Sequence, residues 1–256
     1  MVTRLNVVAL AAAALVSLAP LSSAWAGCVG DCGTATANGV VTAAPVGNGS
    51  YSYVSTAAGA TGAVLASIGG VNGSVLTSDV FSAAANDALA FNFDYVTSDG
   101  AGFADYAWAR LMSAGGSQVA MLFTARTVAS GSVVPGTGMP APTASLNPSS
   151  VSILSGTTWA QLGTDSGRCY STGCGHTGWV NSSYTLTSAG NYYLEFGVAN
   201  WGDTSFDSGM AVAGITVAGQ TVNTAAAVPE PESWALLMAG LGAVGIVRRR
   251  RRRQSV

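Results

Sequence analysis

The sequence predicts an all-β protein, an antiparallel β-sandwich of jelly-roll type, with an N-terminal signal helix and a single C-terminal membrane helix. Three observations support this. Apolar and polar side chains alternate over many short stretches, which is the period of a half-buried strand. Clusters of Gly, Ser, Asn and Asp separate these stretches, as in sandwiches. Between the terminal segments, no window shows the 3.6-residue apolar stripe of an amphipathic helix.

Five stretches carry the strand pattern most clearly. In the first, Leu89, Phe91, Phe93 and Tyr95 fall on one face, because successive side chains of a strand point to opposite sides. The other four are residues 106–112, 119–128, 192–198 and 210–217. Residues 133–148 hold four prolines and are expected to form a long surface loop.

The chain divides into four parts. They are a signal peptide (1–26), a β-sandwich domain (27–222), a linker (223–227) and a sorting and anchor segment (228–253). About 200 residues between the terminal segments are enough for one domain with its own core. The linker consists of small and polar residues and is expected to be flexible.

Charge is distributed unevenly along the chain. All ten basic residues are arginine, and six of them form the run Arg248, Arg249, Arg250, Arg251, Arg252 and Arg253. Residues 27–228 hold three arginines against ten acidic residues, a net charge of −7. Such a body repels phosphate backbones, so no nucleic-acid partner is expected. The absence of lysine excludes lysine-based covalent catalysis.

The first 26 residues have the order of a secretory signal. Arg4 supplies the charged start, residues 7–18 form a short apolar core, and small residues surround Trp25. We expect signal peptidase to cleave after Ala26. The alternative is a lipoprotein signal that ends at Cys28, although Trp25 stands where that motif usually has Leu.

Three features follow one another at the C-terminus. Pro229, Glu230 and Pro231 come first, residues 234–247 are uncharged, and the arginine run follows. As a helix, these fourteen residues span about 21 Å. That is shorter than a hydrocarbon core of about 30 Å, but bilayer thinning and snorkelling arginines cover the difference. Cations held in the cytoplasm fix the orientation, so we expect an inner-membrane anchor with the body outside the cytoplasm.

This order of features resembles the PEP-CTERM sorting signal of Gram-negative bacteria. The resemblance implies that an exosortase, a membrane-embedded cysteine peptidase, recognises Pro229, Glu230 and Pro231. It then cuts the protein from its inner-membrane anchor and joins it to a surface acceptor. The resemblance implies a final place on the cell surface or in the extracellular matrix, beside extracellular polysaccharide. Prolines on both sides of Glu230 keep the motif extended, so it can lie in an active-site groove.

Four cysteines form two close pairs, Cys28 with Cys32 and Cys169 with Cys174. In an exported chain, local disulfides are the expected outcome. The alternative places Cys169, Cys174 and His176 around a metal ion. It lacks a fourth ligand nearby in the sequence, and thiols outside the cytoplasm oxidise. His176 is otherwise expected on the surface.

Two loops carry paired aspartates. Asp99 and Asp105 flank a Gly-rich stretch, and Asp203 and Asp207 flank Thr-Ser-Phe. Aspartate stabilises turns through its own backbone. The same carboxylates could bind calcium, although neither loop matches an EF-hand. Both interpretations stay open, and no other cofactor is predicted.

Two stretches, residues 98–107 and 200–211, resemble a β-sandwich domain that recurs in PEP-CTERM proteins of unassigned activity. The resemblance implies an architecture and no ligand. Trp201 lies in the second stretch and could stack on a sugar ring. Aromatic residues at alternating strand positions usually belong to the core, so burial is expected for Tyr106 and Trp201 is left open.

No catalytic set stands out in the sequence. There is no Gly-x-Ser-x-Gly elbow, and Glu195, the one glutamate before the C-terminal segment, is expected to face solvent. We therefore predict a non-enzymatic surface or matrix protein with a structural or adhesive role in the polysaccharide layer. The first alternative is a carbohydrate-binding module that uses Trp201 and the aspartate loops, with or without calcium. The second is a hydrolase.

Overall fold

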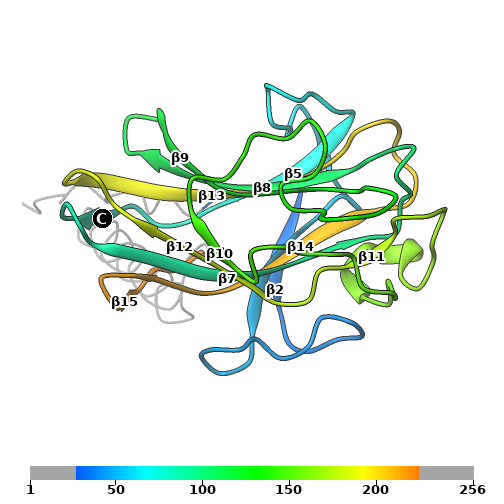
Figure 1. Ribbon diagram of the computed structural model, residues 1–256, viewed down its shortest axis with the longest axis horizontal. Coiled ribbons are helices and arrows are strands. Elements are labelled where there is room, and N and C mark those ends of the chain that lie inside the picture. The colour runs from blue at the N-terminus through cyan, green and yellow to red at the C-terminus, as the bar shows by residue number, and fades with distance from the viewer. Residues whose placement is uncertain (1–26, 225–256) are drawn as a thin grey trace, which may run out of the picture.

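The computed structural model describes residues 27–224. Two antiparallel β-sheets face each other, and almost all of the regular structure is strand (Figure 1). The prediction of an all-β antiparallel sandwich is therefore confirmed. The signal helix, the sorting motif and the membrane helix lie outside the described residues. Within residues 27–224, no helix has the length and apolar character needed to cross a membrane.

Sheet A has seven strands, and its main path runs in the order β1-β5-β13-β8-β9. Strand β4 pairs with β5, and β6 pairs with β13. The bounds are β1 (Gly27–Val29), β4 (Ala60–Thr61), β5 (Asn72–Thr77), β6 (Phe81–Ala83), β8 (Tyr106–Ser113), β9 (Gln118–Arg126) and β13 (Gly190–Asn200).

Sheet B has eight strands, and its main path runs in the order β10-β12-β7-β14-β3-β2. Strand β11 pairs with β7, and β15 pairs with β14. The bounds are β2 (Asp31–Ala35), β3 (Tyr51–Ser55), β7 (Ala88–Thr97), β10 (Ser145–Asn147), β11 (Gly175–His176), β12 (Val180–Thr185), β14 (Ser208–Val217) and β15 (Gln220–Thr221). One 3-10 helix, η1 (Ala160–Asp165), lies beside sheet B.

The strand register defines two ends of the sandwich. In sheet B, Thr97 of β7 lies opposite Ser208 of β14 at one end, and Leu89 lies opposite Val217 near the other. We call the first the distal end; it carries residues 98–105, 168–174 and 201–207. We call the second the linker end; it carries residues 218–221, and residues 222–224 run back from it along β14 as far as Ser52. Figure 1 shows β11 toward one side of the molecule and β15 toward the opposite side.

The main core lies between the sheets. Leu89, Phe91, Phe93 and Tyr95 of β7 are fully buried in it, as their alternation predicts. Strand β8 adds Ala107, Ala109 and Leu111 from sheet A. Burial of these apolar side chains is the main force that holds the two sheets together.

The outer faces of both sheets are covered as well. Tyr106 and Trp108 alternate with the core alanines of β8, so they point away from the main core; both are fully buried under residues that include Leu65 and Met139. The expected burial of Tyr106 is confirmed. On sheet B, a second outer cluster gathers Val41, Tyr51, Trp159, Leu162 and Ala211. The sequence pattern did not indicate these covers, because the segments that form them lack a regular period.

Two polar side chains are mostly shielded from solvent, against expectation. The side chain of His176 is only 14% exposed, and its Nδ1 lies 3.7 Å from Oδ2 of the buried Asp94. The expectation of a surface histidine is therefore wrong. The Glu195 carboxylate accepts hydrogen bonds from Nε of Arg110 at 2.7 Å and from Nε1 of Trp108 at 2.9 Å. It belongs to an ion pair on the outer face of sheet A instead of facing solvent.

Residues 133–148 only partly form the expected surface loop. Ser145–Asn147 is strand β10, and Val133 and Val134 are buried. The backbone N–H of Arg126 in β9 donates to the carbonyl of Val133, and the N–H of Thr143 donates to the carbonyl of Met121 in β9. The segment therefore covers the open edge of β9, where unpaired backbone groups would otherwise invite pairing with another chain.

Both expected disulfides are present. Cys28 pairs with Cys32, and Cys169 pairs with Cys174. No free cysteine exists among the described residues. The metal site made of Cys169, Cys174 and His176 is therefore excluded, because both sulfur atoms are bonded to each other.

Candidate functional site

The two stretches that the sequence singled out meet at the distal end. The backbone N–H of Trp201 donates to Oδ1 of Asp105 at 3.0 Å, and the Ser208 hydroxyl donates to Oδ2 at 2.7 Å. The backbone N–H of Ser98 donates to the carbonyl of Asp207 at 3.1 Å. Residues 98–107 and 200–211 therefore form one joined unit above the ends of β7 and β14.

Asp105 is the centre of a buried polar network beneath these loops. The Tyr95 hydroxyl donates to the carbonyl of Asp105 at 2.9 Å. The Ser208 hydroxyl lies 2.8 Å from Oγ1 of Thr97, which Thr127 also contacts. Burial raises the pKa of Asp105 well above its usual value, and the hydrogen bonds from Ser208 and Trp201 only partly oppose this. A buried network with every hydrogen bond made holds its loops rigidly.

Three other aspartates surround Asp105 at this end. Asp99 accepts the N–H of Gly100 at 2.7 Å. Burial raises the pKa of Asp99 to about 6, and the neighbouring carboxylates of Asp203 and Asp165 add to the shift. Asp203 accepts the N–H of Ser205 at 2.7 Å, the geometry of an aspartate that closes its own turn.

Asp207 joins this group through two contacts. Its Oδ1 accepts the Thr56 hydroxyl at 2.8 Å, and its N–H donates to Oδ2 of Asp165 at 3.1 Å. Burial raises the pKa of Asp207, and the nearby Asp165 carboxylate raises it further. Its carboxylate therefore fastens the last loop to the residue after β3, and its backbone N–H fastens it to the end of η1.

This geometry bears on the calcium interpretation. Each of the four predicted aspartates, Asp99, Asp105, Asp203 and Asp207, accepts a hydrogen bond from the protein's own backbone or hydroxyl groups. Across residues 27–224, no group of three or more His, Cys, Asp or Glu side chains is placed to hold a metal ion. The contacts that are present favour the turn role.

Four aromatic side chains belong to these loops, and we call them the distal aromatic surface: Phe103, Tyr170, Trp201 and Phe206. Tyr170 is 50% exposed and Trp201 is 42% exposed. The Tyr170 ring centroid lies 5.5 Å from that of Phe103 and 5.0 Å from that of Phe206. A Cβ at Gly202 would approach Cδ1 of Phe103 to 2.8 Å, so the Phe103 ring rests directly on the backbone beside Trp201.

Two guanidinium groups stack on this surface. Cζ of Arg126 lies 4.6 Å from the Trp201 ring centroid, and Cζ of Arg168 lies 4.5 Å from that of Phe206. Nε of Arg126 also donates to the carbonyl of Ala104 at 3.0 Å, and Arg168 forms an ion pair with Asp165. Cation–π contact and these anchors hold the rings in defined positions.

The Cys169–Cys174 loop supports Tyr170. The backbone N–H of Tyr170 donates to the carbonyl of Ser98 at 2.9 Å, and the N–H of Ala101 donates to the carbonyl of Thr172 at 2.9 Å. The disulfide closes this loop at its base. Tyr170 is therefore presented from a small cross-linked loop that is fastened to residues 98–103.

The structure thus brings the predicted residues Asp99, Asp105, Trp201, Asp203 and Asp207 to one end. Sequence reasoning missed five members of the site: Phe103, Tyr170, Phe206, Arg126 and Arg168. Two of them, Phe103 and Phe206, lie inside the stretches already singled out, so an aromatic flanked by turn residues was a usable signal. The arginines stand at the end of β9 and after η1, and nothing in their local sequence indicates that they meet aromatic rings.

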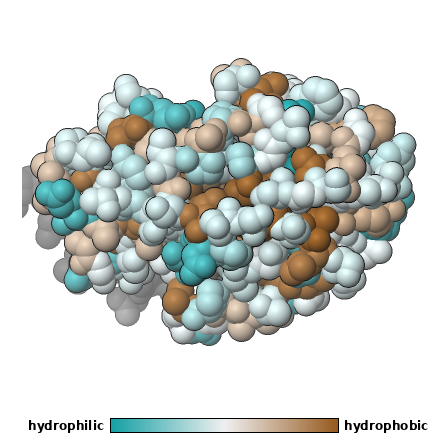
Figure 2. Space-filling view, in the orientation of Figure 1, coloured by the Kyte–Doolittle hydropathy of each residue, from teal (hydrophilic) through white to brown (hydrophobic). Residues whose placement is uncertain are grey.

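The face seen in Figure 2 is mostly pale or hydrophilic, and its hydrophobic side chains form small separate patches. Most large apolar side chains are buried in the three clusters. Exposed aromatics such as Trp201 and Tyr170 are therefore exceptions, and an exposed ring on a rigid loop is a typical binding feature.

Comparison with known proteins identifies only the C-terminal segment. A family model described as the PEP-CTERM protein-sorting motif matches residues 227–252, which confirms the predicted sorting segment. No curated protein and no solved structure matches the chain. The match covers residues outside the described part of the structure and assigns no activity to the sandwich.

Proposed function

We propose the following function. The PEP-CTERM motif marks the chain as an exported protein that an exosortase processes. The mature sandwich is a non-enzymatic protein of the cell surface or extracellular matrix, with a structural or adhesive role in the polysaccharide layer. Its distal aromatic surface makes the adhesive contact, and the partner is a carbohydrate chain. The observation that carries this proposal is the set of three contacting rings, together with Trp201 and two stacked guanidinium groups, at one end of the sandwich.

The arrangement of the two ends supports adhesion. The last described residues, 222–224, run back along β14 as far as Ser52, whereas the aromatic surface lies at the distal end. A protein tethered through its C-terminus therefore presents the rings away from its attachment point. Such a geometry suits contact with material outside the cell.

The chemistry of the distal surface fits a sugar. Aromatic faces pack against the apolar face of a pyranose ring, and guanidinium groups donate hydrogen bonds in a fixed fork. The nearby carboxylates make a strongly anionic polysaccharide a poor ligand, because like charges repel. We therefore propose a glycan of low charge, bound without a metal ion.

The state of the acidic groups supports a non-enzymatic role. Asp105, Asp99 and Asp207 are buried and already paired with the protein's own donors. A glycosidase needs two carboxyl groups that face the scissile bond from an open cleft. His176 lies in β11 beside Asp94, opposite Val96 of β7.

Isothermal titration of the mature body with the host's own polysaccharide tests the proposal. Trp201→Ala and Tyr170→Ala should each weaken binding by about threefold to tenfold, the effect of losing one stacked ring. Val119→Ala is the matched control, because Val119 is an exposed apolar residue of β9 outside this surface. Absence of saturable binding by the unaltered protein would contradict the carbohydrate contact and leave only a structural role.

A further inference from the structure

The linker end holds the chain firmly until shortly before the sorting motif. The N–H of Val222 donates to the carbonyl of Ile215 at 3.0 Å, and the N–H of Asp79 donates to the carbonyl of Asn223 at 3.0 Å. The hydroxyls of Ser52 and Thr224 are hydrogen-bonded at 2.7 Å, and Thr224 is only 6% exposed. The predicted linker of residues 223–227 is thus fastened to the body at its first two residues.

The stretch of chain between Thr224 and the motif is short. Only four residues, 225–228, separate Thr224 from Pro229. Five residue steps span at most about 18 Å even when the chain is fully extended. A peptidase that holds Pro229, Glu230 and Pro231 in its active site must therefore approach the folded body close to Thr224, beside Ser52.

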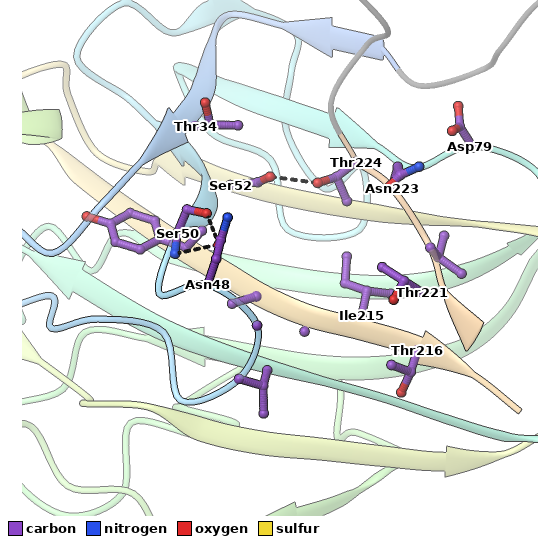
Figure 3. A pocket seen from close by; sticks show the side chains of 16 residues that line it. Thr34, Asn48, Ser50, Ser52, Asp79, Ile215, Thr216, Thr221, Asn223 and Thr224 are labelled. Carbon is purple, nitrogen blue, oxygen red and sulfur yellow. Dashed lines mark hydrogen bonds between the residues drawn. The ribbon is translucent and has the colours of Figure 1, made fainter. Parts of the chain in front are cut away.

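A groove of about 900 Å³ opens at this point. In Figure 3, Asn48 and Ser50 lie on one side, and Asn223 and Thr224 lie on the other. The groove is therefore bordered by the last fastened residues of the chain, directly where the tether begins.

The backbone beside the groove is shaped by a bulge in β14. The pairing of β14 with β7 shifts between Ala213 and Thr216, and Gly214 has φ 63°. A Cβ at Gly214 would lie 2.0 Å from Cγ2 of Val46, so only glycine lets the 46–50 loop close against the strand. Bulges of this kind often occur where a sheet forms a binding feature.

The lining of the groove suits a protein partner. Hydroxyl side chains such as Thr34, Ser50 and Thr221 line the groove together with the aliphatic Ile215 and Val222. Asp79 is the one charged residue in the lining, and within the described chain its buried Oδ1 has no hydrogen-bond partner. Depletion of charged residues is typical of the core of a protein–protein interface.

We infer that this groove is a docking surface for the membrane-embedded peptidase that cuts the sorting segment. The inference rests on the processing route in the proposed function. The tether length forces the enzyme against this end of the body, and the groove supplies the contact there. Docking raises the local concentration of the motif at the active site, because a second contact makes the first one effectively intramolecular.

Pulse-chase labelling of the full-length protein in its host, with conversion of precursor to mature form as the readout, tests the inference. The double variant Thr34→Tyr/Thr221→Tyr fills the groove at two exposed strand positions with a residue that strands accept well. We expect the half-life of its precursor to rise about fivefold, as for loss of a modest interface contact. Thr204→Tyr, an exposed distal residue, is the matched control and should be processed normally.

A second variant keeps the test decisive if the groove variant folds poorly. A flexible spacer of about ten residues, long enough to move the body clear of the active site, is inserted between Thr224 and Ala225. If the body only obstructed the peptidase, the spacer would speed processing; docking predicts no acceleration. Two results would overturn the docking inference and leave the processing route intact. One is faster processing with the spacer, and the other is equal precursor half-lives for the folded groove variant and Thr204→Tyr. Normal processing of Glu230→Ala would instead remove the route itself.

Discussion

The backbone N–H of Trp201 donates to the buried carboxylate of Asp105 over 3.0 Å, and this bond ties the loop after β13 to the loop before β8. The same carboxylate holds the hydroxyl of Ser208 at the start of β14. One side chain therefore positions the two loops that carry Phe103, Trp201 and Phe206. The distal aromatic surface depends on a polar anchor beneath it.

Replacement of Asp105 tests this anchor. Asp105→Ala leaves the N–H of Trp201 and the hydroxyl of Ser208 without their acceptor, so the free energy of unfolding should fall by about 1–3 kcal/mol. Urea unfolding of the mature body measures the change. Asp203→Ala, which removes only a turn contact to Ser205, is the control and should cost less than about 1 kcal/mol. Equal losses for the two variants would contradict the anchoring role.

The raised pKa of Asp99 gives stability a defined pH dependence. The carboxyl has a pKa of about 6 in the folded protein and about 3.8 when unperturbed. Between these values the folded state binds a proton that the unfolded chain has released, so stability falls as pH rises through this window and levels off above it. Melting temperatures across this range should show the fall, and Asp99→Asn should flatten it. An unchanged slope in Asp99→Asn would assign the effect to another group.

Removal of the Cys169–Cys174 disulfide should act on binding as well as stability. The Cys169→Ser/Cys174→Ser variant opens the loop that presents Tyr170, and closing so small a loop contributes about 2 kcal/mol. The Cys28→Ser/Cys32→Ser variant opens a loop of similar size in β1 and β2. Both should lower the melting temperature, and only the first should weaken binding of polysaccharide. Weaker binding in both variants would show that the loss is general.

The buried pair of Asp94 and His176 predicts a further coupling. Burial raises the pKa of Asp94, and the neighbouring His176 lowers it. His176→Ala leaves the carboxylate buried without this partner and should cost about 1–3 kcal/mol of stability. Asp94→Asn in the same background should recover part of the loss, because it removes the charge. Additive losses in a double-mutant cycle would contradict a direct interaction.

Chelation tests the role of the aspartates. Because the carboxylates of Asp99, Asp105, Asp203 and Asp207 already accept hydrogen bonds from the protein, a chelator should leave the melting temperature unchanged. A bound ion would stabilise the native state by mass action. A lower melting temperature in chelator, restored by calcium, would revive the ligand role of these residues.

Much of the fold could be predicted because its long strands alternate cleanly. In strand β7, every second residue from Leu89 to Tyr95 is a core position. Period-two patterning identifies such strands directly. The short strands β4, β11 and β15, each of two residues, carry too few positions for any period. The outer clusters around Trp159 and Trp108 depend on contacts between distant segments, which local pattern does not encode.

The candidate site was predictable in part for a similar reason. Asp105 and Trp201 lie in stretches rich in turn residues, and turn signals mark the loops where sites usually occur. Their hydrogen bond joins residues 96 positions apart, and the stacking of Arg126 on Trp201 joins β9 to the same loop. Both contacts follow from the pairing of strands at one end of the sandwich, so they appear only once the topology is known.

The intact mass of the protein recovered from the cell surface or medium, compared with that of the membrane fraction, tests the central account most directly. We predict a mature form that starts at Gly27 and ends near Pro229, with any extra mass identifying the acceptor joined to the new C-terminus. The membrane fraction should hold the precursor that retains Arg248–Arg253. A surface form that still carries these arginines would contradict exosortase processing and describe a protein that simply stays anchored.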